Sequence, residues 1–139
     1  MGNKSFKSLC ELGFIETQTG KKVTVRMGAP AFDPEHATYH CLTEISGLEG
    51  GNIAPAHGVD PFQAICMSLE RFRVLFAKHG GDFRTAGGSS PHTVFPKEIP
   101  WVYGSDVYQR LCKMVDAEIQ KIEDELTRRR EGRDRDEEK

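Results

Sequence analysis

Hydrophobic and polar residues alternate in the first third of the chain, which is the pattern of β-strands with one buried face. The alternation is clearest around Val23, Val25 and Met27, whose neighbours are Lys22, Thr24 and Arg26. Residues 17–21 have the length and the glycine of a hairpin loop. The alternating segments are residues 9–16, 22–27 and 38–45.

A fourth strand is predicted over residues 52–57. Pro55 cannot donate a hydrogen bond to a neighbouring strand, so this segment is expected at a sheet edge. Residues 30–34 carry a proline at each end and break the alternation. The chain order predicts an antiparallel meander of about four strands, with a further short strand around residues 82–85.

A change of period to three and four residues predicts a helix after this meander. It begins at Asp60 and Pro61, a capping carboxylate followed by proline at the first helical position, and ends near His79 because Gly80 supplies a left-handed stop. Arg73 falls inside the apolar stripe, and we expect its guanidinium to reach water or a sheet carboxylate. The stripe comprises Phe62, Ile65, Cys66, Leu69, Phe72 and Phe76.

A second amphipathic helix is predicted from about residue 106. If it covered residues 106–130 it would span about 37 Å, whereas a globule of this length has a radius of gyration of about 14 Å. Either a partner chain or a second copy covers its distal apolar face, or the helix lies diagonally over its own sheet. The apolar face carries Val107, Leu111, Met114, Val115, Ile119, Ile122 and Leu126.

These elements predict one α+β domain over residues 1–127, in which one helix packs on the sheet and a long amphipathic helix ends the domain. Residues 128–139 are almost wholly charged and are expected to fray into solvent. A chain of 139 residues with 37% hydrophobic residues has enough apolar material for one packed core, and not for two.

The formal net charge of −2 removes any broad attraction to phosphate backbones or anionic lipid. We therefore predict neither a nucleic-acid partner nor a membrane. No leader opens the chain and no apolar run approaches the roughly 18 residues of a membrane span, so a cytoplasmic location is expected. The four cysteines form no closely spaced pair and are interpreted as buried thiols.

Candidate chemistry is sparse. His36, His40 and Cys41 lie close in sequence, and strand pairing could bring His57 near them. His40 and Cys41 point to opposite faces of one predicted strand and cannot readily share one ion, so no metal or cofactor is predicted. The segment 89–92, Ser-Ser-Pro-His, lies in a glycine-rich connection over residues 80–104 without a strand-nucleophile-helix turn or a phosphate-binding motif. The sequence predicts no catalytic residue, and the connection is interpreted as a polar linker.

An aromatic and proline-rich stretch over residues 95–103 precedes the last helix. Such aromatic side chains either form a contact surface or fill a small core from a loop, and the sequence leaves both open. The candidate interaction residues are Val115, Ile119, Ile122, Leu126, Phe95, Trp101 and Tyr103.

The segment 58–65, Gly-Val-Asp-Pro-Phe-Gln-Ala-Ile, followed later by Gly80-Gly81-Asp82-Phe83, resembles the G-x-D-x-x-Q-A helix start of an uncharacterised bacterial family, a domain of unknown function. The resemblance covers about residues 9–100 and leaves the final helix outside it. It implies a bacterial source and a compact α+β fold, and it transfers no catalytic residue.

Two functional hypotheses follow. The first is a non-catalytic interaction protein, of the kind of an immunity or adaptor protein, that forms a homodimer or binds a partner protein through the C-terminal helix. The second is a small hydrolase or ligand-binding enzyme that uses the 80–104 loop, which would require a concave pocket lined by His92 with a partner carboxylate or thiol.

Overall fold

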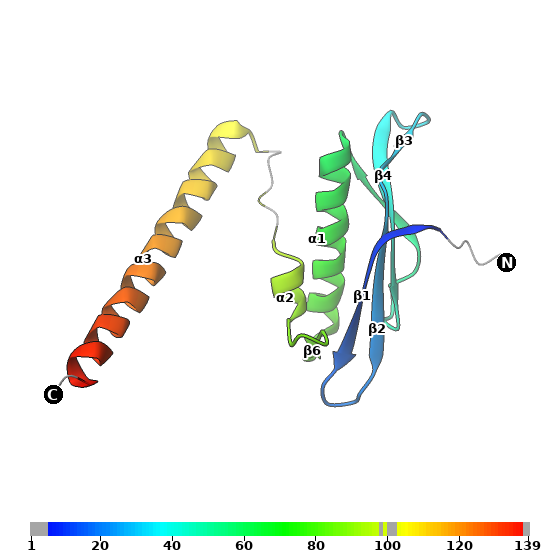
Figure 1. Cartoon of the computed structure of the whole chain (residues 1–139). Coiled ribbons are helices and arrows are strands. Elements are labelled where there is room, and N and C mark those ends of the chain that lie inside the picture. The colour runs from blue at the N-terminus through cyan, green and yellow to red at the C-terminus, as the bar shows by residue number, and fades with distance from the viewer. Residues whose placement is uncertain (1–5, 98, 100–102, 138–139) are drawn as a thin grey trace. The chain divides into compact units, whose positions relative to one another are not determined.

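A computed structural model describes residues 6–97, 99 and 103–137, and the chain divides into two units, one ending at residue 98 and the other beginning at residue 99. We call them the α+β unit and the helical unit. The extent of a single domain over residues 1–127 stays a prediction. The elements are β1 (Ser8–Glu16), β2 (Lys22–Gly28), β3 (Ala31–Asp33), β4 (Thr38–Ser46), β5 (Ala54–Gly58), α1 (Pro61–His79), β6 (Phe83–Arg84), α2 (Pro91–Val94) and α3 (Ser105–Glu137) (Figure 1).

The strands form one antiparallel sheet in which β4 pairs with β3, β2 and β5, β2 also pairs with β1, and β1 pairs with β6. Thr43 lies opposite both Met27 of β2 and Ala54 of β5, so these two strands occupy opposite edges of β4. Tyr39 lies opposite both Phe32 and Gly58, which places β3 on the same edge as β2. The predicted meander and the edge position of the Pro55 strand are confirmed.

The sheet has six strands, where the alternation predicted about four. The strand missed outright is β3, because its three residues lie between Pro30 and Pro34 and are too few to show a period. The short strand expected around residues 82–85 is present as β6. The strand faces that the alternation predicted to be apolar are the ones that enter the core. Their buried residues include Phe14, Val23, Val25, Cys41 and Ile45.

The start of α1 is fixed by a reciprocal pair of hydrogen bonds. The Gln63 amide donates to Asp60 Oδ1 at 2.8 Å, and the Gln63 side-chain oxygen accepts from the Val59 amide at 2.6 Å. Gly58 allows the end of β5 to approach the helix, since a Cβ there would lie 2.4 Å from the Ala64 nitrogen. The residues that carry the family resemblance therefore join a strand to a helix.

The face of α1 that packs on the sheet differs from the predicted stripe. Its buried residues are Ala64, Ser68, Phe72 and Phe76, whereas Phe62 is 80% exposed. A search for large apolar residues overlooks Ala64 and Ser68, but their spacing of four places them in line with Phe72 and Phe76. Ser68 is accommodated because its hydroxyl donates to the Ala64 carbonyl at 2.8 Å. The predicted end of the helix at His79 is confirmed, with Gly80 donating to the Phe76 carbonyl.

Aromatic rings dominate the core of the α+β unit. The Phe14 ring centroid lies 4.9 Å from that of Phe76, and Phe76 lies 5.1 Å from Phe83. Phe95 closes the cluster from the segment after α2, with its centroid 5.2 Å from Phe72. Every ring of this cluster precedes residue 98, so the α+β unit contains its own core.

The cysteine prediction is wrong for most of the four residues. Only Cys41 is buried; Cys10 and Cys66 are exposed and Cys112 is intermediate. Cys66 is exposed because, like Phe62, it lies off the face of α1 that packs on the sheet. Cys10 lies near the start of β1. Burial raises the pKa of the Cys41 thiol. None of the four cysteines forms a disulfide.

The helix α3 has 33 residues, about 50 Å at 1.5 Å per residue. It continues to Glu137, through most of the charged run that was expected to fray. Within the described residues of the helical unit it is the only helix or strand. In the part of the chain that the structure describes, no helix is long and apolar enough to cross a membrane.

Candidate functional site

A small cleft lies where β6 and α2 meet the end of α1. Its volume is about 190 Å³. Phe76 and Phe83 supply apolar lining, and its polar lining includes Arg84, Ser90 and His92 together with Asp82. Residues 80–95 of the segment that was interpreted as a polar linker are therefore folded within the α+β unit, and they help to form a concave surface.

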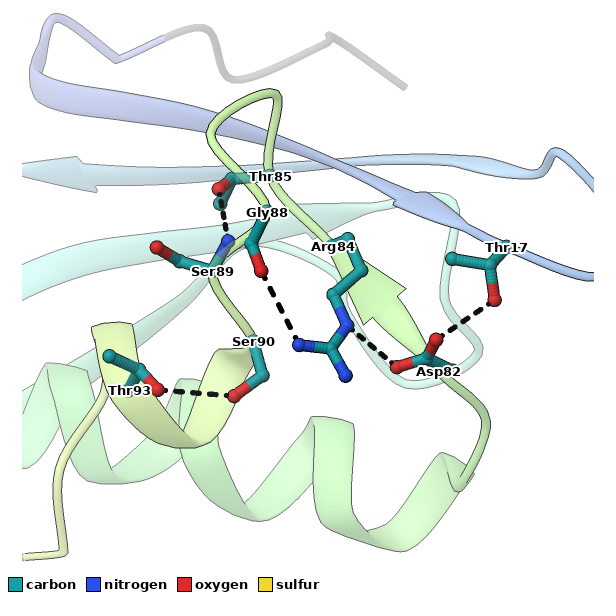
Figure 2. Close-up of polar contacts among 8 residues, drawn as sticks. All are labelled: Thr17, Asp82, Arg84, Thr85, Gly88, Ser89, Ser90 and Thr93. Atoms are coloured by element: carbon teal, nitrogen blue, oxygen red, sulfur yellow. Dashed lines mark hydrogen bonds and ion pairs between the residues drawn. The ribbon is translucent and has the colours of Figure 1, made fainter. Parts of the chain in front are cut away.

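Hydrogen bonds hold this loop in place (Figure 2). Arg84 Nε donates to Asp82 Oδ1 at 2.8 Å, and Arg84 Nη1 donates to the Gly88 carbonyl at 3.3 Å. The other Asp82 oxygen accepts from the Thr17 hydroxyl at 3.0 Å. The Ser89 amide donates to Thr85 Oγ1 at 3.0 Å. Both oxygens of Asp82 are thus used to connect β6 to the hairpin loop after β1.

Ser90, which lines the cleft, is also the capping residue at the start of α2. The Ser90 hydroxyl shares a hydrogen bond with the Thr93 hydroxyl, 3.3 Å away, and its carbonyl accepts from the Thr93 and Val94 amides. Ser90 therefore begins α2, and among the described residues no hydrogen bond joins it to His92. The Ser90 hydroxyl is thus engaged with Thr93, and the cleft presents Arg84, Asp82 and His92 as polar groups that can bind a small polar ligand.

A second hollow lies on the helix side of β1 and β2 and has a volume of about 310 Å³. Its lining is almost entirely apolar and includes Leu12, Val25, Met27 and Val94. The helix α1 contacts mainly β4 and β5, and its Leu69 and Phe72 form one wall of the hollow over β1 and β2. The hollow could accept an apolar side chain or ligand.

Three histidines lie close together around the turn between β3 and β4. His40 lies opposite His57 in the sheet, and the His57 ring centroid is 5.9 Å from that of His40 and 6.1 Å from that of His36. His36 Nδ1 lies 2.7 Å from Asp33 Oδ2, and this contact lowers the pKa of the Asp33 carboxyl. Only Asp33, Glu35 and His36, in the described part of the chain, bring three potential ligand atoms within 4.8 Å of one another.

Arg73 does not reach the sheet. Its guanidinium binds Glu70, one turn earlier on α1, at 2.8 Å and 2.5 Å, and this pairing raises the pKa of Arg73. Arg71 is the residue that connects α1 to the sheet, because it donates to the buried Thr43 hydroxyl at 2.9 Å and to the Asn52 carbonyl at 3.0 Å. Partial burial lowers the pKa of Arg71.

The three aromatic candidates, Phe95, Tyr103 and Trp101, differ in their location. Phe95 is only 4% exposed and belongs to the core, so it is removed from the candidate interaction surface. Tyr103 is 70% exposed, at the start of the helical unit. Trp101 lies outside the described residues.

The helix α3 carries an apolar seam with a regular heptad spacing. Successive members are separated by four, three, four, three and four residues, which keeps them within an arc of about 80° at 100° per residue. On this helix Val115, Ile119 and Leu126 are 47–48% exposed and Ile122 is 52% exposed. We call the set the α3 seam, and its members are Tyr108, Cys112, Val115, Ile119, Ile122 and Leu126.

Sequence reasoning found the apolar face of this helix and missed its heptad spacing. Val107, Leu111 and Met114 widen the face in the first three turns, and this breadth hides the narrower repeat. The signal was available in Tyr108 and Cys112, which are less hydrophobic than the aliphatic residues and complete the repeat toward the N-terminus.

Comparison with known proteins finds one family. Residues 11–84, more than half of the chain, match the model described as Domain of unknown function (DUF6968). The match begins in β1 and ends with β6, so it covers the sheet and α1 and excludes α3. Neither the curated proteins nor the solved structures contain a match.

Proposed function

The chain belongs to the DUF6968 family, and from this starting point we propose that it is a non-catalytic interaction protein that binds a protein chain through the α3 seam. The single observation that carries the proposal is the seam itself: six residues at heptad spacing on a helix that has no neighbour among the described elements of its own unit. Heptad seams of this kind pair with another helix.

The energetic reason is the exposed apolar area. Burying a side chain such as isoleucine or leucine stabilises an assembly by about 1.5–3 kcal/mol relative to leaving it in water. Ile119, Ile122 and Leu126 are each half exposed on the helix, so a facing helix would gain part of that value at every one. Contiguous apolar surface of this kind marks protein contact sites.

Two forms of the proposal share this seam: a homodimer, and a complex with a different protein. The proposal includes a bacterial source and a cytoplasmic location. Four cysteines without a disulfide support the latter, because cysteines stay reduced in the cytosol. A role as an immunity or adaptor protein agrees with binding that requires no chemistry.

Light scattering coupled to size-exclusion chromatography tests the homodimer form. The full chain is compared with Ile122→Asp, which places a carboxylate in the seam, and with Ala117→Asp, which adds the same group on the opposite face of α3. A dimer that only Ile122→Asp converts to monomer would support the homodimer form. A monomer for all three chains excludes the homodimer and leaves the second form.

Affinity capture from a bacterial extract tests the second form with the same variants as bait. We expect a protein retained by the full chain and by Ala117→Asp and lost with Ile122→Asp. Identical retention by all three baits contradicts binding through the seam.

A second candidate function is the binding of a small polar ligand in the cleft at β6 and α2. The observation in its favour is that the 80–95 segment is folded and places His92 and Ser90 beside Asp82 and Arg84. A thermal-shift screen of small anions and polar metabolites, with His92→Ala as the comparison, tests it. Stabilisation that His92→Ala abolishes supports this function, and equal shifts for both chains reject it.

A further inference from the structure

The flanks of the α3 seam are acidic in its central turns. In a paired helix the positions beside the seam meet the partner's flanking positions, and here they hold Asp116 and Glu123 on one side and Glu118 and Glu125 on the other. All four residues are exposed. Glu118 contacts Lys121 at 3.2 Å, and Glu125 binds Arg129, so their only recorded ion pairs are with exposed side chains of the same helix.

Two copies of this helix would bring these acids together. In a parallel pair, Glu118 of one copy faces Glu123 of the other, and the attractive contact is confined to Glu125 and Arg130 near the end of the seam. In an antiparallel pair aligned for the best overlap of the aliphatic residues, Asp116 meets Glu123 and Glu118 meets Glu125. Like charges opposite one another oppose association in either orientation.

We infer that the occupant of the α3 seam is a helix of a different protein, with its own apolar seam flanked by lysine or arginine. This inference rests on the proposed function and chooses between its two forms. Acidic flanks favour a basic partner through opposite charges and exclude a second copy through like charges, so one set of residues supplies both attraction and discrimination. The aliphatic centre of the seam supplies the non-specific part of the affinity.

A pair of synthetic peptides tests the inference against the full-length protein. The first has the sequence of residues 105–133. The second is the same peptide with Asp116, Glu118, Glu123 and Glu125 replaced by lysine, so the two share one seam and differ only in its flanks. Binding to the full chain is measured by fluorescence anisotropy, and circular dichroism reports the helix content of each peptide.

We expect the lysine-flanked peptide to bind at least about tenfold more tightly than the unmodified one. The ratio should shrink between about 0.1 M and 1 M NaCl, because the Debye length falls from about 10 Å to about 3 Å. The double variant Glu118→Lys/Glu125→Lys of the full chain should lose this preference. Asp124→Lys, which changes a charge on the opposite face of α3, should keep it.

The possible outcomes separate the inference from the proposed function. Equal affinities, tighter binding of the unmodified peptide, or binding of neither peptide overturns the inference of a basic partner. If Ile122→Asp abolishes binding in the first two of these cases, the seam still binds protein and the proposed function stands. If the lysine-flanked peptide binds Ile122→Asp as well as the unaltered chain, attraction is only electrostatic and both proposals fall.

Discussion

The helices α1 and α3 are both amphipathic, and they differ in what lies against their apolar faces. In α1 the buried line is Ala64, Ser68, Phe72 and Phe76, in which two small residues let the helix approach the sheet and two rings fill the core. In α3 the four aliphatic members of the seam, from Val115 to Leu126, are about half exposed on the helix. Small residues in α1 suit one fixed neighbour, whereas the heptad spacing of α3 suits another helix.

The charges beside the two faces differ in the same way. Polar groups next to the α1 face are used within the α+β unit: Arg71 binds Thr43 of the sheet and Arg73 binds Glu70. The acids beside the α3 seam bind only residues of their own helix, in the contacts that the structure records. Arg71 thus connects α1 to the sheet, whereas the recorded ion pairs of Glu118 and Glu125 stay within α3. In our proposal these exposed acids face the partner helix.

The largest expected effect tests the role of α1. Phe72→Ala should lower the free energy of unfolding by about 3–5 kcal/mol, because it leaves a cavity among the rings of Phe14, Phe76 and Phe95. Phe62→Ala, the same substitution ten residues earlier, is the control. It should change stability by less than about 0.5 kcal/mol, since Phe62 is 80% exposed. Urea denaturation followed by circular dichroism measures both, and equal losses would show that the buried face is assigned wrongly.

A smaller effect is expected at the start of α1. Asp60→Ala removes the acceptor of the Gln63 amide and should destabilise the α+β unit by about 1 kcal/mol. Asp60→Asn keeps an acceptor at the same place and should restore most of that loss. Thermal unfolding of the unaltered chain, Asp60→Ala and Asp60→Asn measures the loss and its restoration. A loss that Asn does not restore would assign Asp60 a role other than capping.

The smallest effect is expected from removing α3. A chain that ends at residue 98 retains every ring of the aromatic cluster, so its unfolding midpoint should move by less than about 4 °C, the shift that ~1 kcal/mol causes in a domain of this size. Differential scanning calorimetry measures the midpoint. A much larger fall would show that α3 serves the fold as α1 does, and the contrast between the two helices would disappear.

Local signals predicted the fold where one or two residues decide the structure. Asp60 and Pro61 begin α1, Gly80 ends it, and Pro55 sets an edge strand, because each acts on its own backbone. The buried face of α1 could not be predicted in the same way. Its position depends on the distance between helix and sheet, which Gly58 and Ala64 set and which hydrophobicity does not report.

The candidate sites show the same division. The apolar face of α3 was visible in the sequence because helical spacing is local. The cleft was not, since it needs Asp82, which binds Thr17 of the first hairpin, to hold the 80–95 segment in place. The histidine cluster could not be predicted without the register of β4 against β5. The burial of Phe95 could not be predicted without knowing that the ring of Phe72 lies beside it.

The reciprocal hydrogen bonds of Asp60 and Gln63, together with the close approach of Gly58 to Ala64, fix the connection between β5 and α1. Residues that fix the connection between a strand and a helix preserve the fold and do not specify a binding partner. The family match over residues 11–84 therefore covers a structural frame, from β1 through α1 to β6, and α3 with its proposed binding surface lies outside it. Membership of the family carries no information about what α3 binds.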